Sequence, residues 1–178
     1  MPRTNILTLL QGGDRRAIGR SDQVAAMVSK DPRLFRKLIA GLWSDDPLVR
    51  MRAAGVTEKV TRTSPALIRP YKKELLGLMS EAKQQELRWH LAAIVPRLPL
   101  NPKERQIAAA LLNDYLQDRS SIVKTFALQG LADLAQDDPG LRPEVLESLR
   151  EATRSGTPAM KARSRKLLIH LEKSLSRT

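Results

Sequence analysis

Apolar residues follow a helical pattern that repeats along most of the chain. The segment LVRMRAAG, residues 48–55, places a cation directly after two apolar residues. Related segments follow, and the four aligned cations, here called the anchors, are Arg50, Arg88, Lys124 and Lys161, spaced by 38, 36 and 37 residues. Positions −1, +6 and +10 from each anchor are apolar apart from Gly130, and they share one face of a helix. Each repeat is therefore predicted to contain an amphipathic helix with its cation at the edge of the buried stripe.

A second helix is predicted before each anchor. The segments LFRKLIAGLW, LIRPYKKELLGLM, IAAALLNDYL and LRPEVLESLR carry apolar residues at the spacing of a helix with one buried face. Proline punctuates the same repeat, because Pro65, Pro102 and Pro139 are each 37 residues apart. A residue that favours helix N-caps precedes each of six prolines, at Asp31, Asp46, Ser64, Asn101, Asp138 and Thr157. Strand and hairpin signals are nearly absent, with only 3% aromatic residues.

These patterns predict an all-α fold built as a right-handed superhelical solenoid. Two helices in each unit of about 37 residues carry apolar faces that are buried only when neighbouring units stack. One domain is expected over residues 1–178, with helical pairs at 31–63, 64–100, 101–137 and 138–175. Residues 1–30 fall outside the repeat and are predicted to form a divergent N-terminal cap, with a loose arm as the alternative. The cap contains one short helix, DQVAAMVSK, after a connector with Arg15, Arg16 and Arg20, and the terminal LEKSLSRT is expected to fray.

The helical pairs resemble the HEAT-repeat family and, through it, adaptin-like and armadillo-type proteins. The resemblance rests on the turn followed by an apolar residue and a cation, as in DDPLVRMRAAG, and covers about residues 33–175. The family pattern pairs an aspartate near the turn with the cation. Asp45 or Asp46 fits this role for Arg50, and Asp118 for Lys124, but no such aspartate precedes Arg88 or Lys161. A continuous ladder of aspartate and cation is therefore not expected.

Charge and composition narrow the classes of partner. The chain carries 31 Lys and Arg against 19 Asp and Glu, a formal net charge of +12. This excess favours an acidic protein surface, nucleic acid or lipid headgroups, although a basic surface also serves solubility alone. The absence of cysteine excludes disulfides and thiol chemistry and fits a reducing compartment. No signal peptide or membrane span is indicated, so the sequence predicts a soluble cytoplasmic protein.

Two interpretations of the anchor cations remain open. They can cover apolar neighbours and bond turn carbonyls, or they can form a track that meets an acidic partner. The resemblance implies that the second helices line a concave groove, where offsets +1, +2, +5 and +9 from each anchor would be exposed. The predicted partner-binding residues are Arg50, Arg52, Arg88, Trp89, His90, Arg97, Lys124, Lys161, Arg163 and Lys166, with Lys59 and His170 on the same surface. Trp89 is either a binding hot spot or a packing residue, whereas Trp43 is expected in the core.

Catalytic motifs are scarce. His90 and His170 stand in different repeats without a ligand set for a metal, and no phosphate-binding glycine loop is present. No cofactor is expected. The basic helical pairs also resemble the DNA alkylation-repair glycosylases, for which Trp89 and Asp133 would supply the aromatic and the acid, although Ala93 stands one turn after Trp89 where an acid would be needed. A likeness to HEAT-like phycobilin lyases rests on fold analogy alone.

The sequence therefore predicts a non-enzymatic scaffold that binds an acidic protein segment through a basic groove. The alternative is a nucleic-acid-binding protein that uses the same groove.

Overall fold

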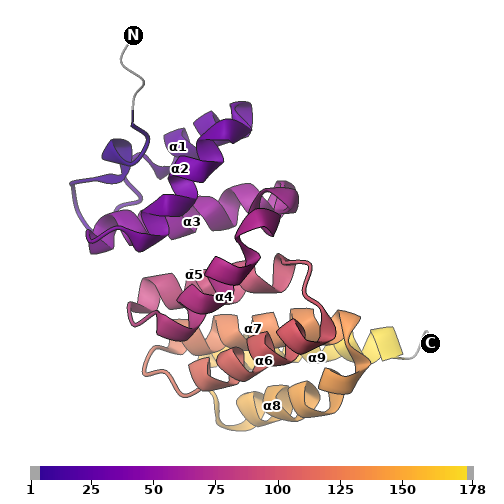
Figure 1. Cartoon of the computed structure of the whole chain (residues 1–178). Helices are drawn as coiled ribbons and strands as arrows, with labels where there is room; N and C mark the ends of the chain where they lie inside the picture. The colour runs from indigo at the N-terminus through magenta and orange to yellow at the C-terminus, as the bar shows by residue number, and fades with distance from the viewer. Residues whose placement is uncertain (1–4, 176–178) are drawn as a thin grey trace. The chain divides into compact units, whose positions relative to one another are not determined.

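The computed structural model describes residues 5–175, and in that part of the chain it contains α-helices and short 3₁₀ helices (η) but no strand (Figure 1). The predicted all-α fold is confirmed. The chain separates into two compact units between Lys72 and Lys73. This division falls inside the second predicted pair, after the first residue of α4 (Lys72–Glu81). Each unit is described by itself, and a single domain over the whole chain stays a prediction.

The first unit is organised around one long helix, α3. Helix α1 and the short helices η1, η3 and η4 all contact α3. The elements are η1 (Thr8–Leu10), α1 (Ser21–Lys30), η2 (Pro32–Leu34), α2 (Phe35–Ala40), η3 (Gly41–Trp43), α3 (Pro47–Thr63) and η4 (Pro65–Tyr71). Ile6, Leu10, Val24 and Val28 are fully buried, so the segment before the first repeat packs as part of this unit.

The second unit consists of helical pairs in which α7 is central. Helix α7 contacts α5 and α9 on either side and also packs against α6 and α8. The elements are α4 (Lys72–Glu81), α5 (Gln85–Ile94), η5 (Val95–Arg97), α6 (Pro102–Tyr115), α7 (Ser121–Asp137), η6 (Pro139–Leu141), α8 (Arg142–Ser155) and α9 (Pro158–Leu175). Fraying was predicted for all of LEKSLSRT, but helix α9 continues into it as far as Leu175. The last three residues lie outside the described part of the chain.

The predicted apolar stripe forms the core of the second helices. Position +6 is buried in all four repeats, and so is position +10, where Val60, Leu98, Leu134 and Leu171 are at most 5% exposed. Position −1 is buried at Val49, Leu87 and Val123, and Met160 is half-buried. Gly130, the exception at +6, is explained by close packing of α7 against α5. A Cβ atom there would lie 2.7 Å from the carbonyl oxygen of Ala92.

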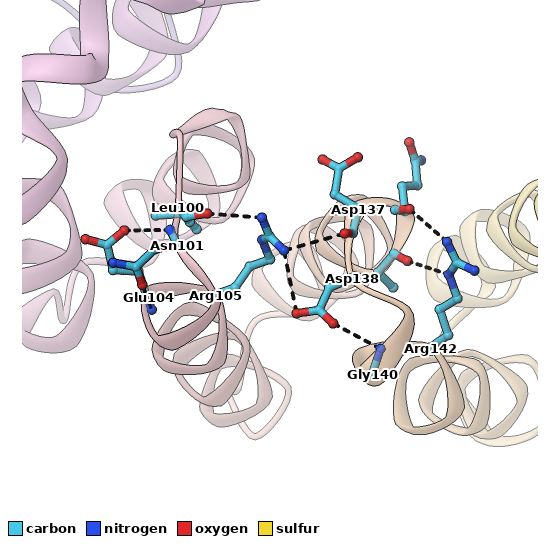
Figure 2. Close-up of polar contacts among 10 residues, drawn as sticks. Leu100, Asn101, Glu104, Arg105, Asp137, Asp138, Gly140 and Arg142 are labelled. Carbon is cyan, nitrogen blue, oxygen red and sulfur yellow. Dashed lines mark hydrogen bonds and ion pairs between the residues drawn. The ribbon is translucent and has the colours of Figure 1, made fainter.

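The predicted N-caps form at most of the prolines. Asp31, Asp46, Asn101 and Asp138 each accept a hydrogen bond from a backbone N–H in the following turn. Asn101 forms a capping box: its Oδ1 accepts from the N–H of Glu104, and Glu104 Oε2 accepts from the N–H of Asn101, both at 2.8 Å (Figure 2). Ser64 makes no side-chain cap on the 3₁₀ helix that begins at Pro65.

Arginines at the starts of α6 and α8 bind the end of α7. Arg142 donates to the carbonyls of Ala135 and Gln136, each at 3.0 Å (Figure 2). Arg105 donates to the carbonyl of Leu100 at 3.1 Å and lies 3.7 Å from the carboxylate of Asp138. Cations are favourable at a helix C-terminus, where carbonyls lack partners within the helix. Two first helices are thereby fixed to the second helix between them.

The first helices of the first two repeats differ from the prediction. LIRPYKKELLGLM is divided into η4 and α4, because Pro70 has no N–H to donate within an α-helix. LFRKLIAGLW is divided among η2, α2 and η3. Trp43, which ends η3, was expected in the core, but this was wrong, since 46% of the residue is exposed. Trp43 ends a three-residue 3₁₀ helix rather than a continuing α-helix.

Candidate functional site

The three second helices of the second unit present one continuous face. Ser121 and Thr157, 36 residues apart at the starts of α7 and α9, share a hydrogen bond of 2.7 Å between their hydroxyls. Arg163 and Gln129, 34 residues apart and two turns further along, are joined by a bond of 2.8 Å. Because the sequence offset is nearly constant, α7 and α9 run parallel and in register.

Solvent-accessible side chains of this face occupy equivalent positions in each helix. Position +2 holds His90, Phe126 and Arg163, and position +9 holds Arg97, Asp133 and His170. Position +5 contributes Gln129 and Lys166, and Trp89 adds its ring from α5. All are half-buried except Lys166 and His170, which are exposed. We call the following set the second-helix face: Trp89, His90, Arg97, Phe126, Gln129, Asp133, Arg163, Lys166 and His170.

A chain of hydrogen bonds crosses the centre of the second-helix face. Arg163 Nη1 donates to Gln129 Oε1 at 2.8 Å, and Gln129 Nε2 donates to Asp133 Oδ1 at 2.8 Å. The guanidinium of Arg163 also lies over the ring of Phe126, 6.0 Å from its centroid. Side chains from adjacent helices are therefore held in fixed relative positions.

Asp133 is the acidic centre of an otherwise basic surface. Burial raises the pKa of its carboxyl above the ordinary value, and the hydrogen bond from Gln129 and the charges of Arg97, Arg163 and His170 oppose this rise. Three basic groups, Arg97 of η5 and Arg163 and His170 of α9, thus act on one carboxylate. The side chains around Asp133 therefore give this part of the surface a positive electrostatic potential.

The aromatic side chains lie near the N-terminal ends of α5 and α7. The rings of Trp89 and His90 are 5.6 Å apart and tilted by 58°. Both residues are half-buried, so Trp89 is in part accessible to a ligand. Ile122, one turn before Phe126 on α7, is 49% exposed. The apolar part of the surface is therefore at one end of these helices, and Arg97 and His170 are at the other.

Two of the four anchor cations have internal partners. Arg50 Nη1 donates to the carbonyls of Ser44 and Asp45, at 2.6 and 3.2 Å. Arg88 forms an ion pair with Asp118 and lies 4.0 Å from the ring centroid of Tyr115. The predicted pairing of Asp118 with Lys124 is wrong. Asp118 lies in the turn between α6 and α7, 30 residues after Arg88, and pairs with Arg88. The internal partners favour a stabilising role for both arginines.

The two lysine anchors lie outside the second-helix face. Lys124 and Lys161 are half-buried. Lys124 lines a pocket of about 540 Å³ with residues of α6, α8 and α9, among them Leu116, Glu147, Glu151 and Met160. The carboxylates of Glu147 and Glu151 both accept hydrogen bonds from Arg154.

The structure overturns the assignment of Arg52 as a partner-binding residue. Arg52 is only 4% exposed. Its guanidinium donates to the carbonyls of Leu10 and Gly12, at 2.9 and 2.6 Å, and to those of Asp14 and Ala17, at 3.0 Å each. The N-terminal connector covers this side of α3, so offset +2 is not on the surface in the first unit. Lys59, at offset +9, is exposed and pairs with Asp22 on α1 at 2.8 Å.

Residues 5–175 contain no group of three potential metal ligands, and none of their helices is long and apolar enough to cross a membrane.

Comparison with known proteins supports the fold alone. No family model matches the chain, and no curated protein matches it. A crystal structure described as an engineered protein from the Northeast Structural Genomics Consortium is similar, with a TM-score of 0.65 and 16% sequence identity. The match covers 95% of this chain and 78% of that one. The all-α fold is therefore shared with a solved structure over nearly the whole chain. The resemblance to HEAT repeats stays a prediction.

Phe126 and Gln129 were not predicted as site residues from the sequence. They lie at offsets +2 and +5 from Lys124. Offset +2 gives His90 and Arg163 in the neighbouring repeats, and offset +5 gives Lys166. The repeat alignment contained this signal. The ion pair of Arg88 with Asp118 and the carbonyl ligands of Arg52 had no comparable sequence signal.

Proposed function

We propose that this protein is a non-enzymatic, HEAT-like scaffold of the cytoplasm that binds an acidic protein segment on the second-helix face. The observation that carries the proposal is the separation of aromatic from cationic side chains along this face. Trp89 and Phe126 supply partly accessible aromatic surface in the N-terminal halves of α5 and α7, and Arg97 and Lys166 supply positive charge further along the helices. A segment with an apolar side chain next to carboxylates matches both parts.

The fixed geometry of Arg163 strengthens this proposal. Its bond to Gln129 and its position over Phe126 limit the rotamers available to its side chain, so less entropy is lost when a ligand binds. Arg163 also lies beside the aromatic part of the face, at the same repeat position as Phe126, and three residues before Lys166. A ligand carboxylate placed there would be bound by a charge-assisted hydrogen bond.

Nucleic acid is the second candidate, favoured by the half-buried rings of Trp89 and His90 on a face that also carries Arg97 and Arg163. Bases stack on such rings, and phosphates bind arginine. Asp133 weighs against this candidate, because its carboxylate interrupts the row of cations that a phosphate backbone would follow. Glycosylase chemistry, the one enzymatic alternative, would require Asp133 as its acidic group.

The experiment is a binding titration with labelled synthetic peptides. One peptide carries glutamates around a central leucine, and its matched counterpart carries lysines in their place. We expect the wild type to bind the acidic peptide only. Arg163→Glu combined with Lys166→Glu should abolish this binding, and Lys103→Glu combined with Arg119→Glu, which makes the same charge change at exposed positions outside the second-helix face, should retain most of it.

Two outcomes would contradict the proposal. Equal losses in both double variants would show that only net charge matters. A catalytic turnover on DNA that disappears in Asp133→Asn would show that the protein is an enzyme. Single-stranded and duplex DNA, titrated in parallel, test the second candidate, since phosphate binding weakens steeply with salt.

A further inference from the structure

The first unit contains a basic loop whose conformation is fixed by a buried cation. Residues 11–20, here called the arginine loop, have the sequence QGGDRRAIGR, and each of them is exposed. The loop connects η1 to α1. Four carbonyls at its start and within it, those of Leu10, Gly12, Asp14 and Ala17, accept hydrogen bonds from the guanidinium of Arg52. The loop is thus folded around the head group of a side chain from α3.

Glycine makes this close wrapping possible. Gly12, Gly13 and Gly19 all have positive φ angles, at 69°, 81° and 57°. A Cβ atom on Gly19 would lie 2.8 Å from Arg52 Cζ. A buried guanidinium is costly unless its donors are satisfied. Here both terminal nitrogens bind two carbonyls each, and Nε is buried without a partner. These hydrogen bonds fix the conformation of a loop that adds little to the apolar core.

The loop presents three arginines, the carboxylate of Asp14 and the apolar side chain of Ile18 to solvent. Arg15, Arg16 and Arg20 are exposed, and Ile18 is 62% exposed. Carboxylates of the same unit are engaged with other groups: Asp22 with Lys59, Glu58 with Arg62, and Asp14 with the N–H of Arg16. Residues 1–72 carry 14 Lys and Arg against six Asp and Glu, a net +8 of the chain's +12. The positive charge is therefore concentrated in the unit that bears this loop.

We propose that the arginine loop binds the phosphodiester backbone of nucleic acid, with Arg15, Arg16 and Arg20 as phosphate ligands and Arg52 as the residue that positions them. Arginine matches phosphate oxygens with a planar pair of donors, and backbone contacts require spaced cations rather than a pocket. An acidic peptide would need apolar anchor sites, and the loop offers only Ile18. A membrane surface would call for a longer basic cluster or a lipid anchor.

This proposal goes beyond the binding of an acidic segment by the second-helix face. It concerns other residues in the other unit, so either proposal can fail while the other stands.

The test measures the affinity of the full chain for labelled random-sequence duplex and single-stranded DNA over a range of salt concentrations. Each phosphate contact with duplex DNA adds about 0.9 to the slope of log K against log salt. Replacing all three loop arginines, by Arg15→Gln, Arg16→Gln and Arg20→Gln, should lower this slope by about 2 to 3. The control replaces three exposed cations of the same unit, by Arg36→Gln, Lys37→Gln and Arg69→Gln, and should leave the slope nearly unchanged.

The positioning role of Arg52 is tested at constant net charge. Lysine cannot reproduce the two-pronged geometry of the guanidinium, so Arg52→Lys should release the loop. We expect a reduced salt slope for DNA and faster tryptic cleavage after Arg15, Arg16 and Arg20, while the helical circular dichroism is retained. If Arg52→Lys does not fold, the triple loop variant and its control decide the question.

Three results would overturn the proposal: no DNA binding by the wild type at low salt, equal changes in the loop variant and its control, or binding to anionic lipid vesicles without binding to DNA.

Discussion

Arg88 on α5 forms an ion pair with Asp118, which lies 30 residues later in the turn between α6 and α7. The guanidinium also lies over the ring of Tyr115, near the C-terminal end of α6. The side chains of Arg88 and Asp118 are only 21% and 11% exposed. One anchor cation therefore joins a second helix to the turn of the following repeat, in place of the turn that precedes it.

Removing either partner of this pair should destabilise the second unit. Arg88→Met leaves the Asp118 carboxylate partly buried without a counter-ion, and we expect a loss of about 2–3 kcal/mol in the free energy of unfolding. Asp118→Asn should give a similar loss. Urea unfolding followed by circular dichroism measures both, and the double variant should lose less than the sum of the two. Strictly additive losses would contradict direct coupling.

Tyr115 gives the second unit a pH dependence at the alkaline end. Burial raises the pKa of its phenol from 10.0 to about 12, while the charge of Arg88 acts to lower it, and its hydroxyl donates to the carbonyl of Met79 at 2.7 Å. The folded pKa lies above the unfolded value, so the neutral phenol stabilises the folded state. This contribution to the free energy of unfolding is complete below about pH 10 and is lost as the pH rises toward about 12.

The corresponding measurement compares wild type with Tyr115→Phe. Between about pH 9 and about pH 12, the wild type should lose about 2 kcal/mol more of its free energy of unfolding than the variant does. Parallel curves for the two proteins would show that Tyr115 ionises as an exposed tyrosine does.

Gly130 is expected to be required for the packing of α7 against α5. A Cβ atom at this position would lie 2.7 Å from the carbonyl oxygen of Ala92 and 3.1 Å from both Cδ atoms of Leu112. Gly130→Ala should therefore cost about 1–3 kcal/mol, despite the better helix propensity of alanine. The matched control is Gly77→Ala in α4, where no atom lies within 4 Å of the added Cβ. That variant should gain up to about 1 kcal/mol, and a gain at Gly130 as well would contradict the close packing.

Asp133 should limit the affinity of the second-helix face for an acidic ligand. Asp133→Asn removes a carboxylate among Arg97, Arg163 and His170, so the acidic peptide should bind roughly three- to tenfold more tightly. Asp114→Asn, an equal charge change at an exposed position of α6, is the control and should have a smaller effect. Weaker binding by Asp133→Asn would indicate that the carboxylate itself contacts the ligand.

The parts of this structure that depend on local sequence were predictable. The buried apolar positions of the second helices, from Val60 in the first repeat to Leu171 in the last, follow from residue spacing within one helix. The caps at Asn101 and Asp138 follow from residue spacing within one turn. Long-range polar partners were not. Arg52 occupies the same repeat position as the accessible His90, and it is buried only because the connector at residues 11–20 folds over it. Sequence spacing does not specify such a path, since glycine-rich segments adopt many conformations.

The central claim, that an acidic segment binds on the second-helix face, can be tested through the fluorescence of Trp89. In a Trp43→Phe background, Trp89 is the single tryptophan of the chain. Titration with the peptide of glutamates around a central leucine should shift or quench its emission, with the same midpoint as an independent binding assay. Saturated binding without any change in Trp89 emission would contradict the proposed site.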